Sequence, residues 1–200
     1  MSIVKGDLAK TAADALVNAA AGTLQMSGGV AAALRKQGGK DVEEEALELA
    51  PIEVGQVIAT TAGKLNAKFV LHAAVIAKPG AQASAESIRK SLRNALDLAD
   101  SLDCQTIGIP ALGCGAGGFD KTEGARLILS ALSDFSAQSL QHAFVVLHSD
   151  ETLKAFETVA SELGIKTVPY VPPKALSVES SDESRPSEES DEVLPEGEAV

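Results

Sequence analysis

The sequence predicts an α/β fold in which helices flank a largely parallel central sheet. Short apolar runs alternate with longer segments whose apolar residues recur at helical spacing, which is typical of parallel strands joined by crossover helices. The helical segments begin at capping residues, and glycine-rich loops follow two of the apolar runs. These three observations together favour a layered sheet with a ligand site at one edge.

Five apolar runs are predicted to be buried strands, because each is short and bounded by polar or glycine-containing segments. They cover residues 15–17, 57–59, 69–71, 106–109 and 143–147. In parallel sheets, ligands lie beyond the carboxyl ends of the strands. The loops after Val17 and Ile109 are therefore the first candidates for a functional site.

Three longer segments are predicted to be amphipathic helices. The first follows an N-cap at Ser84, and the second follows Asp120 with Glu123 three residues on, as in a capping box. The third follows an N-cap at Asp150 and stops at Gly164. Two shorter helices are predicted over residues 28–37 and 41–50, and the acidic run 43–45 is interpreted as a solvated helix face.

The composition limits the number of domains and the classes of partner that we expect. The chain has 200 residues, 45% hydrophobic residues and a net charge of −11, of which residues 177–200 hold −8 through nine acidic residues and Arg185. Residues 1–173 are predicted to form one domain, and residues 174–200 a disordered acidic tail that cannot bury enough apolar surface to fold. The body contains no basic run, so nucleic acid is not an expected partner.

Location and metal content also follow from the sequence. No apolar stretch is long enough for a membrane span, and the first residues lack the pattern of a signal peptide, so a cytoplasmic protein without membrane contact is expected. Cys104 and Cys114 match no metal-binding spacing and are expected to be plain thiols. No metal site or cofactor is predicted, and the oligomeric state is left open.

The most informative loop has four glycines within residues 113–118, between a buried strand and the helix that Asp120 caps. Glycines let backbone N–H groups turn toward a ligand, and a helix start adds positive dipole character. The loop therefore suits a phosphate or diphosphate. The alternative is a glycine-rich turn that packing requires.

A second small-residue loop follows the strand at residues 15–17 and leads to Gly28 and Gly29 at the mouth of a helix. Two glycine-lined helix entrances in one small domain predict two walls of one anion-binding cleft. Asn18, at the predicted strand end, is a candidate ligand residue; local turn bonding is the alternative.

Two further residues have chemistry of their own. His72 stands alone in an apolar run, which favours a hydrogen-bonded core residue over a catalytic base. Cys114 lies in the glycine loop, where neighbouring N–H groups are expected to lower the pKa of its thiol. No histidine lies near it in the sequence, so a nucleophilic role is disfavoured.

Three motifs resemble the macro domain family, the ADP-ribose-binding module. They are Val-Lys-Gly-Asp-Leu at 4–8, Asp-Ala-Leu-Val-Asn-Ala-Ala at 14–20 with Gly-Gly-Val at 28–30, and the segment 110–119. They stand in the family's order, and the resemblance covers about residues 3–168. It implies a three-layer macro-type fold with a mixed, mostly parallel central sheet.

The resemblance also implies roles for individual residues. Asp7 would accept a hydrogen bond from the adenine amino group, with the Leu8 backbone beside it. Residues 28–30 would line the distal ribose and the diphosphate, and residues 113–118 would wrap the diphosphate. The implied ligand-binding residues are Asp7, Leu8, Asn18, Ala21, Ser27, Gly28, Gly29, Val30, Gly113, Cys114, Gly115, Ala116, Gly117, Gly118 and Phe119.

The chain departs from the family pattern at the distal ribose. Ala21 replaces the second asparagine of the usual Asn-Ala-Ala-Asn, Ser27 replaces the first of three glycines, and Gly117 replaces a common aromatic residue. Hydrolytic members often carry an acid where this chain has Ala31. The departures favour a binding module over an enzyme, and no catalytic residue is assigned.

The predicted function is binding of ADP-ribose or a related adenine nucleotide, free or attached to a protein. Hydrolysis of ADP-ribosyl or O-acetyl-ADP-ribose bonds is one alternative. A scaffold whose pocket has degenerated and whose acidic tail recruits a partner is the other.

Overall fold

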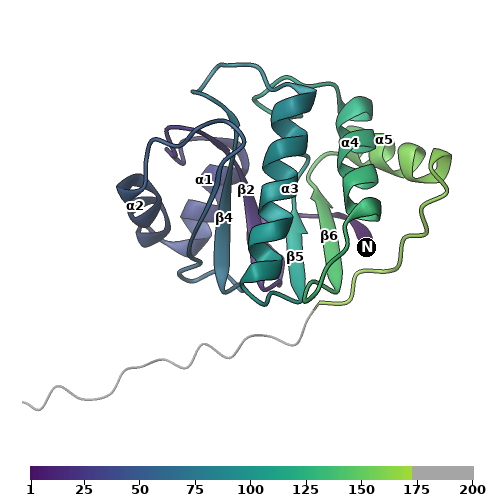
Figure 1. The fold of residues 1–200 in the computed structure, drawn as a ribbon, viewed down its shortest axis with the longest axis horizontal. Coiled ribbons are helices and arrows are strands. Elements are labelled where there is room, and N and C mark those ends of the chain that lie inside the picture. The colour runs from purple at the N-terminus through teal and green to yellow at the C-terminus, as the bar shows by residue number, and fades with distance from the viewer. Residues whose placement is uncertain (173–200) are drawn as a thin grey trace, which may run out of the picture.

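The computed structural model describes residues 1–172, so the predicted disordered tail and its boundary between residues 173 and 174 lie outside the described residues. Six strands form one sheet in the order β1-β6-β5-β2-β4-β3 (Figure 1). The strands are β1 (Ser2–Lys5), β2 (Ala15–Ala21), β3 (Val57–Thr61), β4 (Phe69–Ile76), β5 (Thr106–Ile109) and β6 (His142–Leu147). The helices are the 3-10 helix η1 (Leu8–Lys10), α1 (Gly29–Gly38), α2 (Asp41–Glu48), α3 (Ala85–Ser101), α4 (Lys121–Asp134) and α5 (Asp150–Glu162).

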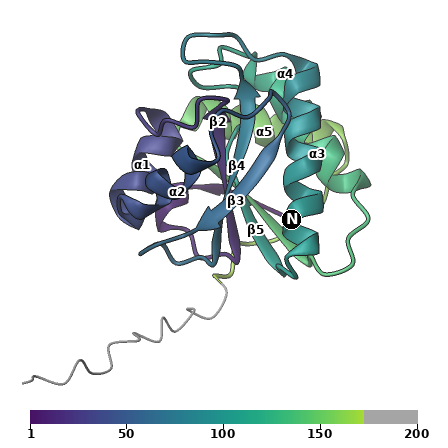
Figure 2. The same cartoon turned by 60° about the vertical axis from the view of Figure 1, so that its left-hand side comes forward.

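The sheet is parallel except at one edge, where β3 pairs antiparallel with β4. Helices cover both faces: Figure 2 shows the strands between α1 and α2 on one side and α3 on the other. This arrangement confirms the predicted α/β fold with a mixed, mostly parallel sheet. Within residues 1–172, no helix has the length and apolar character that crossing a membrane requires.

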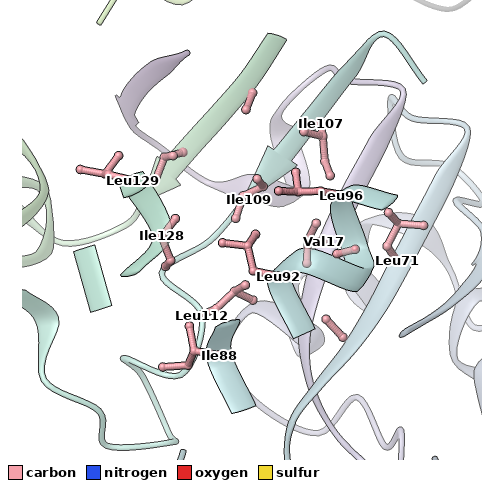
Figure 3. Close-up of a cluster of buried hydrophobic side chains, with 14 of the residues drawn as sticks. Val17, Leu71, Ile88, Leu92, Leu96, Ile107, Ile109, Leu112, Ile128 and Leu129 are labelled. Carbon is pink, nitrogen blue, oxygen red and sulfur yellow. The ribbon is translucent and has the colours of Figure 1, made fainter. Parts of the chain in front are cut away.

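Alternate residues of each central strand supply the two halves of the core. On one face, strand side chains pack against α3 and α4; the labelled members in Figure 3 are Val17, Leu71, Ile88, Leu92, Leu96, Ile107, Ile109, Leu112, Ile128 and Leu129. On the other face, Leu16 and Val70 pack with Leu34 of α1 and Val42 of α2. Helices with one apolar face therefore bury it on both sides of the sheet.

Two predicted helix caps are confirmed and one is wrong. Ser84 forms a capping box with Ser87, and the Asp120 side chain accepts hydrogen bonds from the first-turn N–H groups of α4, although Glu123 returns no bond. The cap of α5 is Ser149, not Asp150. Ser149 has extended backbone and its Oγ accepts from the Thr152 N–H, so the helix begins one residue earlier than predicted.

The strands are longer and more numerous than the sequence pattern predicted. Strand β1 was not predicted, because a segment of four residues is too short to show a clear strand pattern. It becomes a strand by pairing with β6. Strand β2 continues through Asn18 to Ala21, since its alanines pair with β4 along their whole length. The loop after this strand therefore starts at Gly22 and not after Val17.

The acidic run at the start of α2 is not merely a solvated face. Glu43 accepts a hydrogen bond from the Met26 N–H at 2.7 Å and forms an ion pair with Arg35 at 3.1 Å. Glu45 accepts from the N–H and the hydroxyl of Thr61. These carboxylates tie α2 to the segment before α1 and to the edge strand.

Candidate functional site

A cavity of about 460 Å³ lies at the carboxyl ends of the parallel strands. Its walls come from the segments that end or follow β1, β2, β4, β5 and β6. Because the strand order is β1-β6-β5-β2-β4, these segments form one row across the edge of the sheet. The lining residues are Gly6, Asp7, Leu8, Ala19, Gly28, Gly29, Val30, Ala33, Val75, Ile76, Pro110, Ala111, Gly113, Cys114, Gly115, Ala116, Gly117, Val146, Leu147, His148, Ser149 and Thr152.

The glycine loop after β5 lines this cavity and carries N–H groups that are unpaired within residues 1–172. Within the loop, Cys114 donates to the Ala111 carbonyl, and Phe119 donates to the Gly113 carbonyl. The N–H groups of Gly113, Gly115, Ala116 and Gly117 have no acceptor among residues 1–172. Adjacent unpaired N–H groups in a loop form an anion-binding concavity.

Packing and backbone shape explain only part of the glycine content of this loop. Gly113 has a φ of +76°, and a methyl group placed on it would lie 2.8 Å from Ile88 Cδ1. A methyl group on Gly117 would lie 2.7 Å from the Gly113 carbonyl oxygen. Gly115 is exposed and lies outside the left-handed region. A methyl group there would meet no atom of the described residues within 4 Å. The fold does not require a glycine at that position.

The opposite wall is the start of α1. Its N-cap, Gly28, has extended backbone with a φ of −156°, and no side chain caps the helix. Among residues 1–172, a methyl group on Gly28 would also meet no atom within 4 Å. The uncapped first turn leaves positive dipole character facing the cavity, as in helix ends that bind anions.

Asp7 closes the cavity at the β1 side. Its Oδ1 accepts a hydrogen bond from the Ala9 N–H at 3.0 Å and caps η1, which holds the carboxylate in place. Its Oδ2 has no hydrogen-bond partner among the described residues and is free for a ligand. Beside it, Leu8 also lines the cavity, and its side chain is buried in the core.

The cavity lining has one carboxylate and no lysine or arginine among the described residues. An anion held here would therefore depend on backbone N–H groups rather than on a cationic side chain.

Comparison with known proteins identifies the family to which this chain belongs. Residues 17–128 match the Macro domain family model. The chain is 38% identical to an uncharacterized protein of Aquifex aeolicus over 80% of this chain and 96% of that protein. This chain is a macro domain.

Two further matches place this macro domain among its relatives. An uncharacterized protein of Mycobacterium tuberculosis is 36% identical over 78% of this chain, which spans 43% of that protein's length. The solved structure of a mutant Oceanobacillus iheyensis macrodomain with ADPR is 25% identical, with a TM-score of 0.74, and the match covers 82% of this chain and 93% of that chain.

Most residues that the resemblance implied lie on the cavity wall of this macro domain, but five do not. Ala21 is the half-buried last residue of β2, and Ser27 is exposed before α1. Gly118 and Phe119 line a separate shallow hollow between α4 and α5. Asn18 lies within β2, where its side chain is buried and hydrogen-bonded to His72.

His72 is a hydrogen-bonded core residue, as the sequence predicted. Its Nδ1 lies 3.1 Å from Asn18 Nδ2, and its Nε2 lies 3.0 Å from Thr60 Oγ1. Burial lowers the pKa of His72 to about 4, with a small opposing effect from Glu45. The imidazole is therefore neutral at pH 7 and does not line the cavity.

The expected lowering of the Cys114 pKa is wrong. Burial, followed by the nearby charge of Asp120, raises the pKa of the Cys114 thiol to about 11. The sulfur contacts the carbonyl oxygens of Leu112 and Asp120 instead of the loop N–H groups. Cys114 is therefore a poor nucleophile at neutral pH.

Sequence reasoning missed the contributions of β4 and β6 to the cavity. Val75 and Ile76 end β4, while His148, Ser149 and Thr152 follow β6. The rule that ligands lie beyond strand ends applies to these strands as well. Applying it to all parallel strands, rather than to two, would have found them.

Proposed function

We propose that this macro domain binds ADP-ribose in the cavity at the carboxyl ends of the strands. The single observation that carries the proposal is the run of unpaired N–H groups at Gly115, Ala116 and Gly117 on the cavity wall. These groups offer hydrogen bonds to a diphosphate without a cationic side chain. The solved mutant macrodomain of Oceanobacillus iheyensis with ADPR, which shares the fold, supports the same ligand.

The order of the strands determines which end of the cavity holds the adenine of ADP-ribose and which end holds its second ribose. Asp7 is at the β1 and β6 end of the row, and the two glycine walls are in the middle. Adenine at Asp7 places the diphosphate between Gly28 and the loop around Gly115. The second ribose then lies toward Val75 and Ile76 at the end of β4, where the lining side chains are apolar.

The free Oδ2 of Asp7 is the group that selects adenine. A carboxylate accepts a hydrogen bond from the adenine amino group and repels the carbonyl group that hypoxanthine carries at the same position. A hydrogen bond to a charged group contributes about 1.5–3 kcal/mol, which corresponds to roughly a tenfold to hundredfold change in affinity. Asp7 therefore distinguishes the two bases.

The test is a calorimetric titration of the full chain with ADP-ribose and with inosine diphosphate ribose. We expect the wild-type protein to prefer ADP-ribose by at least tenfold. The Asp7→Asn variant keeps an oxygen to cap η1 but places an amide N–H₂ in reach of the base, so it should lose or invert this preference. Absence of ADP-ribose binding to the wild-type protein would overturn the proposal, and equal affinity for both ligands would overturn the role of Asp7.

A further inference from the structure

We propose that Ala83 is a positioning residue that holds the glycine loop after β5 in its anion-binding shape. This inference rests on the proposed function, because it concerns how the same loop binds a diphosphate. Ala83 is half-buried and does not line the cavity. It acts on the ligand only through the loop.

Ala83 touches the loop in two ways. Its N–H donates a hydrogen bond to the Gly117 carbonyl at 2.9 Å. Its methyl group lies against both inner glycines: a methyl group placed on Gly113 or Gly117 would come within 2.9 or 3.0 Å of the Ala83 Cβ. The loop therefore rests on one alanine through a hydrogen bond and a close packing contact.

A rigid element holds Ala83 in place. The next residue, Ser84, is the N-cap of α3 and is bonded reciprocally to Ser87. The first buried turn of that helix carries Ile88, whose Cδ1 would lie 2.8 Å from a methyl group on Gly113. Figure 3 shows Ile88 beside Leu112, immediately before the loop. The start of α3 and the glycine loop thus form one packed unit.

The loop needs this support because its ligand-binding part has little internal bonding. Gly115 and Ala116 are exposed, and their N–H groups have no acceptor among residues 1–172. The bonds at Cys114 and Phe119 close the two ends of the loop, and the turn from Gly118 N–H to the Gly115 carbonyl lies between them. The bond from Ala83 to Gly117 is the one that comes from outside the loop. An anion-binding loop gains affinity when its donors are already oriented before the ligand arrives.

The segment that carries Ala83 also begins at the cavity. It leaves β4 at Ile76, which lines the far wall, and reaches Ala83 through the exposed residues 77–80. In Figures 1 and 2, this connection and the loop before α4 lie together at the same end of the sheet. One short segment therefore joins two walls of the cavity.

The experiment compares Ala83→Val with Gln82→Val, a matched change at an exposed neighbour with no hydrogen bond to the loop. The larger side chain at residue 83 should displace Gly113 and Gly117, while the one at residue 82 should not. We expect Ala83→Val to weaken ADP-ribose and ADP at least tenfold by calorimetry. Adenosine, which has no phosphate, should change less than twofold in ligand-detected NMR titrations.

The conservative variant Ala83→Gly keeps the N–H donor but removes the packing contact, so it should weaken ADP-ribose less than Ala83→Val does. Amide NMR resonances of residues 113–118 should shift in unliganded Ala83→Val, with those of residues 28–30 unchanged. Wild-type affinity for ADP-ribose in Ala83→Val would overturn the inference. Equal losses of adenosine and ADP-ribose would also overturn it, because a general structural defect predicts that result.

The positioning role of Ala83 can be tested even if the proposed function is wrong. If the wild-type protein does not bind ADP-ribose, the amide resonances of the unliganded variants decide the inference. Unchanged resonances of residues 113–118 in Ala83→Val would then refute the positioning role.

Discussion

Asn18 and His72 lie in register on the neighbouring parallel strands β2 and β4, and their buried side chains form a hydrogen bond. Thr60 on β3 continues the contact to the other ring nitrogen of His72. The Thr60 hydroxyl donates to the Thr61 carbonyl, so His72 Nε2 is the donor to Thr60, and Nδ1 accepts from Asn18. The three residues join three strands through a neutral imidazole.

This arrangement predicts a loss of stability in mild acid. The pKa of His72 is about 4 in the folded protein and 6.5 in the unfolded chain, so the unfolded chain binds the proton more tightly. The stabilisation that comes from the neutral His72 is fully present above pH 6.5 and is lost as the pH falls toward 4. It amounts to about 3 kcal/mol in the free energy of unfolding.

Urea denaturation at pH 7.5, 6.0 and 5.0 measures this loss. The variant His72→Gln should have a flatter dependence on pH over this range. His148→Gln is the control, because His148 is exposed and forms no side-chain hydrogen bond within residues 1–172. A wild-type slope that survives in His72→Gln would contradict the assignment.

Glycine substitutions in the loop after β5 should separate stability from binding. Gly113→Ala should lower the free energy of unfolding by at least about 1 kcal/mol, because its φ is +76° and Ile88 occupies the space. Gly115→Ala meets no atom and needs no left-handed backbone. It should leave the thermal midpoint unchanged or slightly raised and weaken ADP-ribose, since Gly115 lines the cavity and the variant adds a methyl group there.

Thermal unfolding and calorimetric titration of the two variants provide the readout. A Gly115→Ala variant that binds ADP-ribose as tightly as the wild type would show that the ligand does not approach this backbone. A stable Gly113→Ala variant would contradict the packing argument.

Glu43 should support the opposite wall of the cavity from behind. Its carboxylate holds the Met26 N–H and pairs with Arg35, and Met26 is fully buried just before Gly28. Removing the acceptor leaves a backbone N–H without its partner, which costs about 1–3 kcal/mol. Glu43→Ala should therefore lower the thermal midpoint and weaken ADP-ribose.

Glu44→Ala is the matched control, since Glu44 is exposed on the same helix and forms no ion pair or side-chain hydrogen bond within residues 1–172. Both variants are compared by thermal unfolding with and without ADP-ribose. Equal behaviour of the two variants would refute the supporting role of Glu43.

Local features of the fold were predictable because their causes are local. Ser84 and Asp120 cap their helices through bonds to N–H groups two or three residues away, and the apolar face of α3 follows from its own spacing. Membership of the macro domain family was predictable because its motifs stand in order along the chain.

Features that depend on distant partners were not predictable. The four residues of β1 become a strand only by pairing with β6. Asn18 was predicted to be a ligand residue, with turn bonding as the alternative, but it lies within β2 opposite His72 of β4. The glycine loop predicted a lowered pKa for the Cys114 thiol, yet packing against α4 buries its sulfur and raises its pKa.

The sequence by itself determined the fold class, the helix caps at Ser84 and Asp120, and the two glycine loops, since each rests on interactions between residues close in the chain. Only the tertiary structure decided which loops share one cavity, because the strand order brings together segments that are far apart in sequence. The same holds for Ala83, whose contact with Gly117 depends on how α3 packs beside the loop. Burial and pairing across the sheet are collective properties, and no single segment contains them.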